Sequence, residues 1–392
     1  MGECDTLFHS ARRQRQPPPA AAPATLAQIP RRFAVTTRRH HTLALAFLAL
    51  ALAAAAAPPQ LAPLPQVTIL ATGGTIAGTA ATSTATVGYT AATVGVAALI
   101  AAVPELAAVA RVSGEQVFQI ASENMTPAHW LILARRVDEL LARDDVAGVV
   151  ITHGTDTLEE TAYFLDLVVK SAKPVVLVGA MRPSTAISAD GPMNLYNAVA
   201  LAASREAVGR GVMVCMNDRI DAARDVTKTN TVALDTFRSP ELGILGVMEG
   251  GRPAFYRTAE RAHTTATEFD VTNVKELPNV GVALAYAGSG RVAIDALVAA
   301  GVKGIVNAGV GDGSLSVEAK AALVEARKRG IVVVRASRIP GGAVARNGEA
   351  NDDALDFVVA DNLSPQKARI LLALALTRTA DTREIQRMFR RY

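Results

Sequence analysis

Residues 148–161 read GVVITHGTDTLEET, and this stretch decides the fold class. Its first five residues form a short run rich in Val and Ile, which is typical of a strand buried on both faces. A polar loop follows, and residues 158–169 then place Phe164, Leu165 and Val168 with helical spacing. A buried strand that leads through a short loop into a helix predicts one βα unit of a parallel sheet.

The same alternation of apolar runs and helical patterns continues on both sides of this stretch. Further buried strands are predicted at 66–71, 174–178 and 211–216. A second series is predicted after residue 279, with strands at 280–285, 304–307 and 331–336 and helices at 292–300, 317–329, 365–376 and 382–389. These series predict an α/β protein with a larger N-terminal parallel-sheet domain at 66–255 and a smaller C-terminal α/β domain at 280–392, joined by a linker at 256–279.

Residues 1–57 are expected to lie outside this fold as an N-terminal extension and secretory signal. Basic residues at 38–39 precede the unbroken apolar run 43–57, which is shorter than the roughly 20 residues that span a bilayer. A basic flank, a short apolar run and an Ala-rich end are typical of a cleaved signal, so a periplasmic or secreted protein is predicted. The Pro-rich segment 58–65 then serves as a linker. The alternative for residues 43–57 is an Ala-rich helix of a globular core. Because a secretory signal normally lies close to the N-terminus, translation is expected to start near Val35.

Composition excludes several classes of protein. Half of the 392 residues are hydrophobic and 19% are charged, which argues against a disordered chain. Residues 1–57 hold seven Arg against two acidic residues, whereas the rest of the chain carries 33 basic and 34 acidic side chains. A nearly neutral body gives no indication of a nucleic-acid-binding surface. Cys4 and Cys215 are too few for a disulfide scaffold, and Cys215 is expected in the core.

A glycine-rich loop, TGGTIAG at 72–78, ends the first predicted strand. Ligands of open parallel sheets bind beyond the carboxyl ends of the strands, so the loop is a candidate site. Its spacing is not G-x-G-x-x-G and no Gly-Lys-Ser/Thr follows, which disfavours a nucleotide. The loop presents the hydroxyl of Thr75, a candidate nucleophile if a neighbouring group lowers its proton affinity. The alternative is a turn in which Thr75 bonds its own backbone.

A second polar loop follows the strand of 148–152 and brings Thr155 and Asp156 to the same sheet edge. His153 lies there too, but no Ser-His-Asp arrangement is evident, so a histidine-dependent mechanism is an alternative without support. No group of His, Cys and carboxylates has the spacing of metal ligands, so no metal is predicted. Lys228 lies among small hydroxyl residues and is a candidate base or electrostatic support where it is partly buried. The alternative is a solvated surface lysine.

Together these segments resemble the bacterial type II (periplasmic) L-asparaginases of the asparaginase/glutaminase family. Two motifs carry the resemblance, ILATGGTIA at 69–77 and ITHGTDTLEET at 151–161. Shorter matches accompany them, namely AMRP at 180–183, SADGP at 188–192, ARDVTKTNT at 223–231 and SPQKAR at 364–369. The resemblance runs from about residue 66 to the end of the chain. It implies hydrolysis of L-asparagine to L-aspartate and ammonia, without a cofactor.

The resemblance also implies a catalytic role for five residues. Thr75 matches the nucleophile, which attacks the side-chain amide and becomes an acyl-threonine. Tyr89 matches a tyrosine on a mobile loop that helps to activate this nucleophile. Thr155, Asp156 and Lys228 match a second hydroxyl–carboxylate–amine group, and Thr155 also stands where backbone donors stabilise the oxyanion. The division of labour between the two threonines and their bases stays open.

Further positions match residues that bind the substrate. Ser122 and Glu123 match the pair that holds the α-carboxylate and α-amine, to which Thr155 and Asp156 contribute. Glu349 matches a carboxylate from a neighbouring subunit, with a register uncertain by about one residue, and the resemblance implies a homotetramer. Clamping both ends of a zwitterionic amino acid requires donors for its carboxylate and carboxylates for its ammonium. Such clamping would hold the amide carbon against the nucleophile.

Two departures bear on the choice of substrate, because some family members carry Gln at the position of Glu123 and Asn in the loop matched by 287–290. A dual glutaminase–asparaginase is therefore one alternative, and an exported amino-acid-binding protein without catalysis is another. Some members have an intradomain disulfide, which this chain lacks because the matching region near Leu141 and Ser171 has no cysteine.

Overall fold

The strand and helix expected at 148–169 are present as β3 (Val146–Thr152) and α4 (Leu158–Val168). They belong to a computed structural model that describes residues 63–392, which form one unit by their internal contacts. The predicted extension and signal at 1–57 and linker residues 58–62 lie outside the described residues. No helix among those described is long and apolar enough to cross a membrane.

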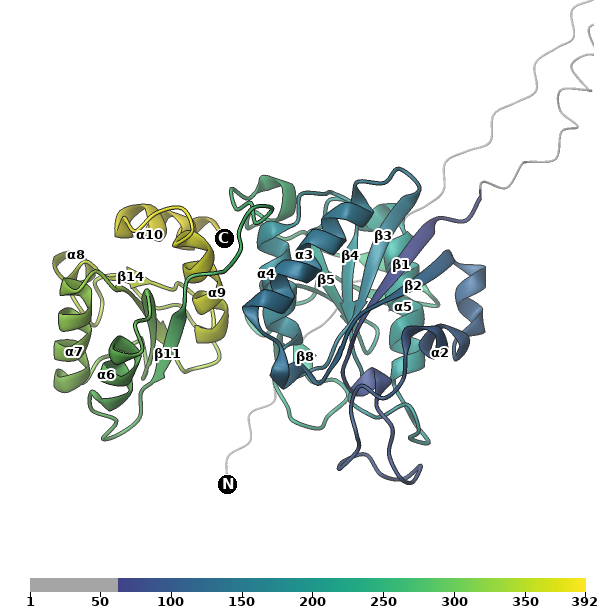
Figure 1. Cartoon of the computed structure of the whole chain (residues 1–392), viewed down its shortest axis with the longest axis horizontal. Coiled ribbons are helices and arrows are strands. Elements are labelled where there is room, and N and C mark those ends of the chain that lie inside the picture. Colours follow the sequence, from purple (N-terminus) through teal and green to yellow (C-terminus); the bar gives the residue numbers. More distant parts are fainter. Residues whose placement is uncertain (1–62) are drawn as a thin grey trace, which may run out of the picture. The chain divides into compact units, whose positions relative to one another are not determined.

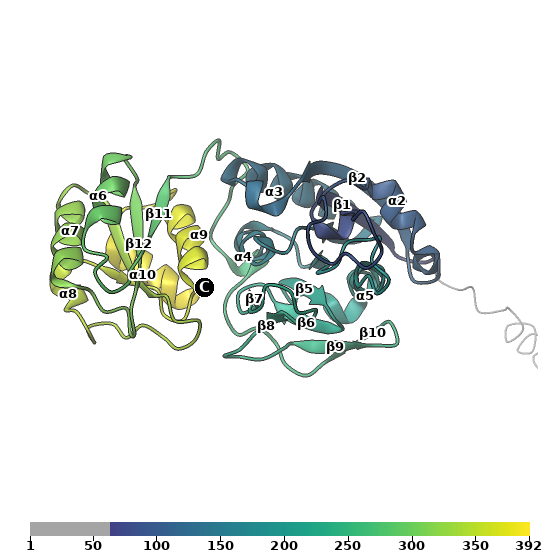
Figure 2. The ribbon, with the colours of Figure 1, turned by 90° about the horizontal axis from the view of Figure 1, so that it is seen from below.

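The larger sheet has the strand order β10-β9-β6-β5-β4-β3-β1-β2 (Figures 1 and 2). Its strands are β1 (Gln66–Gly73), β2 (Arg111–Ile120), β3, β4 (Val175–Val178), β5 (Val212–Met216), β6 (Arg219–Ala222), β9 (Gly246–Glu249) and β10 (Arg252–Phe255). The helices of this part are α2 (Val96–Ala101), α3 (Pro127–Leu141), α4 and α5 (Gly191–Ala203). Short 3-10 helices are η1 (Thr75–Ala77), η2 (Pro104–Ala108), η3 (Ser122–Asn124) and η4 (Arg205–Ala207).

The predicted parallel sheet is confirmed from β2 to β5, and the edge from β6 to β10 differs by being antiparallel. The reason lies in the turn between β5 and β6. Asn217 and Asp218 both adopt positive φ, of 51° and 60°, which makes a two-residue hairpin turn. A connection of two residues is too short for the crossover that a parallel neighbour needs.

The two faces of this sheet are buried against different helices, because neighbouring residues of a strand point in opposite directions. Val149 and Ile151 of β3 pack in a core with α3 and α4, whereas Val150 packs in a second core with α5. Figure 1 shows the helices on both sides of the sheet. Burial on both faces explains the uninterrupted apolar runs of the central strands.

The smaller sheet lies in the C-terminal part, and its four strands are parallel in the order β11-β12-β13-β14. The elements are β11 (Val280–Leu284), α6 (Val292–Ala299), β12 (Gly304–Gly309), α7 (Val317–Lys328), β13 (Val332–Ser337), α8 (Asp352–Leu355), β14 (Val358–Val359), α9 (Pro365–Ala375) and α10 (Thr382–Arg391). Strands β7 (Thr227–Lys228) and β8 (Phe237–Arg238) form a separate two-stranded sheet, and η5 (Thr264–Ala266) follows β10 in the chain. The predicted α/β fold with two sheets of different size is confirmed, while the domain boundaries at 255 and 280 remain predictions.

Helix α9 links the smaller sheet to the larger part of the chain. Leu371 and Leu374 on α9 share one hydrophobic core with Phe164 and Leu165 on α4. In the same region Gln366 and Arg369 of α9 contact the two glutamates in the first turn of α4. This packing brings residues near 366 close to the loops that follow β3.

Candidate active site

The loops that follow β1 and β3 touch at two glycines. Gly74 has φ of 81°, and a Cβ atom built on it would lie 2.3 Å from the backbone nitrogen of Gly154. Only glycine permits both this conformation and this approach. The contact brings Thr75, the first residue of η1, to the same edge of the sheet as Thr155.

Thr75 is buried, with 6% of its surface exposed, and its hydroxyl contacts a second hydroxyl. The distance from Thr75 Oγ1 to Tyr89 Oη is 2.8 Å. Tyr89 is half-buried on the irregular segment after η1, where Thr79 and Thr90 form an isolated β-bridge. The side chain of Thr75 therefore has a partner from another loop, rather than its own backbone.

Lys228 forms the second cluster with Thr155 and Asp156. Its Nζ donates to Thr155 Oγ1 at 2.9 Å and to Asp156 Oδ1 at 2.6 Å. The lysine side chain is 17% exposed, so it is partly buried, whereas Asp156 is 62% exposed and open to a ligand. Lys228 lies on β7, where pairing with Phe237 on β8 holds its backbone.

Ser122 and Glu123 lie on η3, directly after β2. Ser122 is buried, and its Oγ accepts a hydrogen bond from the backbone N–H of Asp156 at 3.2 Å. The hydroxyl of Thr157 donates to the carbonyl of Ser122 at 2.8 Å. These contacts tie η3 to the loop after β3, while Glu123 remains exposed.

All seven of these predicted residues line one cavity of about 690 Å³. This volume is in the range of small-molecule sites. Further lining residues, to which the sequence analysis gave no role, are Thr86, Val87, Met181, Arg182, Thr231 and Val232. The only sequence signal for Arg182 was its place in the AMRP motif, and Thr231 closes the motif that contains Lys228.

His153 lies beside this site but does not line the cavity. It is fully buried, and burial lowers the pKa of His153 to about 4. The Gly154 carbonyl lies 2.8 Å from its Nδ1 and can only accept, so Nδ1 carries the hydrogen and Nε2 accepts from Thr161 Oγ1 at 2.9 Å. Thr161 in turn accepts from Trp130 Nε1. A neutral histidine with both nitrogens occupied supports the loop and is not a base for the cavity.

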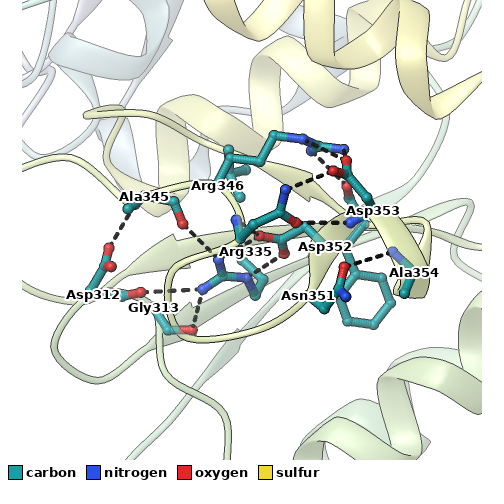
Figure 3. A network of polar contacts seen from close by, with 12 residues as sticks. Asp312, Gly313, Arg335, Ala345, Arg346, Asn351, Asp352, Asp353 and Ala354 are labelled. Carbon is teal, nitrogen blue, oxygen red and sulfur yellow. Dashed lines mark hydrogen bonds and ion pairs between the residues drawn. The ribbon is translucent and has the colours of Figure 1, made fainter.

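Glu349 does not line the cavity of this chain and is exposed, in the segment between β13 and α8. Figure 3 shows what holds this segment, a buried ion pair between Arg335 and Asp352. Arg335 also donates to the carbonyls of Gly313 and Ala345. The buried ion pair and these hydrogen bonds hold the segment that presents Glu349. The predicted role of Glu349 depends on a second subunit.

The described residues contain no group of three His, Cys, Asp or Glu side chains placed to hold a metal ion. The groups that line the cavity include three hydroxyls, a phenol, an ammonium group and two carboxylates.

Comparison with known proteins places this geometry in a family. The family model "Asparaginase, N-terminal" matches residues 66–261, and "Glutaminase/Asparaginase C-terminal domain" matches residues 279–389. The chain is 50% identical over 330 residues to the glutaminase-asparaginase of Pseudomonas fluorescens biotype A, covering 84% of this chain and 91% of that one. It is also 50% identical over 329 residues to L-asparaginase 2 of Escherichia coli K12, covering 84% and 94%.

A solved structure agrees with these matches. The crystal structure of a probable cytoplasmic L-asparaginase from Campylobacter jejuni superposes with a TM-score of 0.82 at 50% identity, covering 84% of this chain and all of that one. The two family models together cover most of the chain. A sequence identity of 50% is far above the level at which two proteins share only a fold. The chain belongs to the asparaginase/glutaminase family of hydrolases.

Proposed function

We propose that this protein hydrolyses L-asparagine to L-aspartate and ammonia through an ester on Thr75. The observation that carries the proposal is the contact of 2.8 Å between Thr75 Oγ1 and Tyr89 Oη inside the cavity of about 690 Å³. It supplies a hydroxyl nucleophile with a hydroxyl partner for its proton. The relatives named L-asparaginase and glutaminase-asparaginase support the choice of substrate.

In the first step Thr75 Oγ1 bonds to the side-chain amide carbon of the substrate. The threonine proton passes to Tyr89 Oη, and the phenol gives its own proton to the departing nitrogen, which leaves as ammonia. This relay keeps Tyr89 neutral before and after the step. Water then cleaves the ester by the reverse relay, releasing aspartate and restoring both hydroxyl groups.

The second cluster supports this step electrostatically. The Lys228 ammonium, held by Thr155 and Asp156, places positive charge at the edge of the cavity where the amide oxygen gains negative charge. Backbone donors of the loop that carries Thr155 complete the oxyanion site. We assign the activation of Thr75 to Tyr89 because Lys228 contacts the other threonine, Thr155, and its neighbour Asp156.

The α-amino and α-carboxylate groups of the substrate are bound by Ser122, Glu123, Thr155 and Asp156. Glu123 and Asp156 are the open carboxylates that an ammonium group requires, and the Ser122 and Thr155 hydroxyls can donate to a carboxylate. Glu349 of a neighbouring subunit completes the site in this proposal, and the resemblance to the family implies that the active form is a homotetramer. No metal or other cofactor takes part.

Glutamine is a second substrate in this proposal. It differs from asparagine by one methylene, and a pocket discriminates such a pair by only about 1–3 kcal/mol. One relative carries both activities in its name. Comparing kcat/KM for the two amides measures the preference.

Residues 43–57 act as a secretory signal in the same proposal, and the mature enzyme works in the periplasm or outside the cell. The mature chain then comprises the linker 58–65, the domains 66–255 and 280–392, and the linker 256–279 between them. Sequencing the N-terminus of the exported protein tests the signal. Retention of residues 43–57 in that protein would refute it.

The test of the reaction is ammonia release from asparagine and glutamine by the wild type and by Thr75→Ala. We expect the variant to lose at least about a thousandfold in kcat while it still binds the substrate. A slow amide substrate should leave its acyl mass on the peptide that contains Thr75. Near-normal turnover of the variant would reject the nucleophile, and binding without ammonia release by the wild type would favour an exported binding protein.

A further inference from the structure

A buried ammonium group from α9 holds the segment that leads into Lys228. Lys367 lies in the first turn of α9 with 2% of its surface exposed. Its Nζ donates to the carbonyls of Ala223 at 3.0 Å and Arg224 at 2.9 Å, and to that of Val226. All three ammonium hydrogens are therefore used. Because a buried charge without partners is costly, the three carbonyls and the lysine hold each other in place.

A buried carboxylate holds Lys228 itself. Glu159 is 4% exposed, and its Oε2 accepts the backbone N–H of Lys228 at 2.6 Å. Its Oε1 accepts from Gln366 Nε2 at 2.7 Å, and Gln366 adjoins Lys367 on α9. Glu159 lies in the first turn of α4, where the helix dipole favours a negative charge.

The Lys228 side chain is a flexible stem of four carbons, so its backbone must be fixed for Nζ to meet two acceptors. Lys367 fixes the residues before it, Glu159 binds its N–H, and β8 pairs with it on the other side. We propose that Glu159, Gln366 and Lys367 are positioning residues that place the Lys228 ammonium against Thr155 and Asp156. The inference rests on the proposed function for its catalytic consequence and on the contacts above for its geometry.

Glu159→Met tests the proposal with an unbranched side chain of similar length that accepts no strong hydrogen bond. The Lys228 N–H and Gln366 Nε2 both lose their acceptor. We expect kcat for asparagine to fall about 10- to 100-fold, because displacement of a group by ~1 Å has effects of this size. We expect KM to change less than about threefold, since the residues that bind the substrate remain in place.

Glu160→Met is the matched control. Glu160 is the next residue on α4 and pairs with Arg369 of α9 at 3.2 Å, but it has no contact with Lys228. Its replacement weakens the same helix contact without releasing the lysine. We expect its kcat to stay within about threefold of the wild type. An equal loss of kcat in both variants would show a merely structural role and overturn the proposal.

Glu159→Gln is the conservative variant. Its side-chain oxygen accepts the Lys228 N–H, and its NH₂ group donates to Gln366 Oε1 once the Gln366 amide turns over. We expect its kcat to stay within about fivefold of the wild type. A Glu159→Gln variant as slow as Glu159→Met would overturn the proposal.

Crystal structures of the two variants separate this inference from the proposed reaction. In Glu159→Met we expect the distance from Lys228 Nζ to Asp156 Oδ1 to exceed hydrogen-bond range, and in Glu159→Gln to stay near 2.6 Å. An undisturbed lysine in Glu159→Met would overturn the positioning role even where the wild type is active. A displaced lysine in Glu159→Met, together with a wild type that has no amidase activity, would instead reject the proposed function alone.

Discussion

Asp352→Asn removes one charge from the buried ion pair of the C-terminal part while it keeps the shape of the side chain. Both partners are fully buried, and Arg335 Nε and Nη2 donate to Asp352 Oδ1 at 2.6 Å and to Oδ2 at 2.8 Å. Oδ2 also accepts the backbone N–H of Asn347 at 2.8 Å. The variant therefore leaves the guanidinium buried without a counter-charge and loosens the segment that carries Glu349.

The size of the effect follows from burial. Removing one partner of a buried ion pair costs about 3–5 kcal/mol. With an unfolding entropy of about 2.1 cal/mol/K per residue, a loss of about 4 kcal/mol lowers Tm by about 6 °C if residues 63–392 unfold as one unit. The shift is about 17 °C if residues 280–392 unfold alone. The core shared between α4 and α9 favours the smaller shift.

Calorimetry of the variant and of Asp353→Asn measures this difference. Asp353 is the adjacent carboxylate and pairs with Arg346, but its side chain is 63% exposed, so this variant should move Tm by no more than about 1 °C (Figure 3). Removing both charges with Arg335→Met/Asp352→Leu should recover part of the loss, because no unpaired charge remains. Equal Tm values for Asp352→Asn and Asp353→Asn would refute the reasoning.

Three further predictions concern subunits and pH. Mixing Glu349→Ala with Thr75→Ala subunits should restore part of the asparaginase activity that each variant lacks alone. No recovery in assays of the reassembled mixture would show that the site is not shared. Burial lowers the pKa of His153 from 6.5 to about 4, so the neutral histidine stabilises the fold fully above pH 6.5. This stabilisation, about 3 kcal/mol, is lost as the pH falls towards 4. Urea unfolding of His153→Gln should lack this pH dependence. Burial raises the pKa of Asp166 from 3.8 to about 7, so the stability that its protonated form contributes is lost as the pH rises from 4 to 7. In the same assay, Asp166→Asn should be more stable than the wild type at pH 8.

The central strands are predictable because burial on both faces requires a continuous run of apolar residues. The runs at 148–152 and 174–178 lie within or beside β3 and β4, and helices with a continuous pattern, such as α7, match within a residue or two. The edge strand β2 was omitted. It is at most partly buried along its length and contains Gly114, so no apolar run marks it.

Helix α3 was also omitted, although its signal is present in the sequence. Thr126 caps its N-terminus and accepts the N–H of His129, and Pro127 occupies the first turn. Helix α3 has this capping pattern but no continuous apolar run of the kind that marks the central strands. The antiparallel edge was missed for a different reason, because its only local sign is the pair Asn217-Asp218 in a hairpin turn.

The residues of the candidate site fall into two groups, those that the sequence predicts and those that it does not. Residues that would touch the substrate, such as Thr75 and Asp156, follow strands directly, so their meeting at one sheet edge follows from topology alone. Residues that hold them do not. Lys367 lies 141 positions after the carbonyl of Val226 that it binds.

A lysine two residues into a helix normally indicates a solvated surface, because burial of an ammonium group requires compensation that a local sequence does not show. The compensation for Lys367 comes from three carbonyls of another segment, and that for Glu159 comes from the N–H of Lys228 and the amide of Gln366. Each of these groups would look unremarkable alone. Their function arises only from hydrogen bonds that they make together in a buried place. Comparing Glu159→Met with Glu159→Gln is therefore a sharper test than either variant alone.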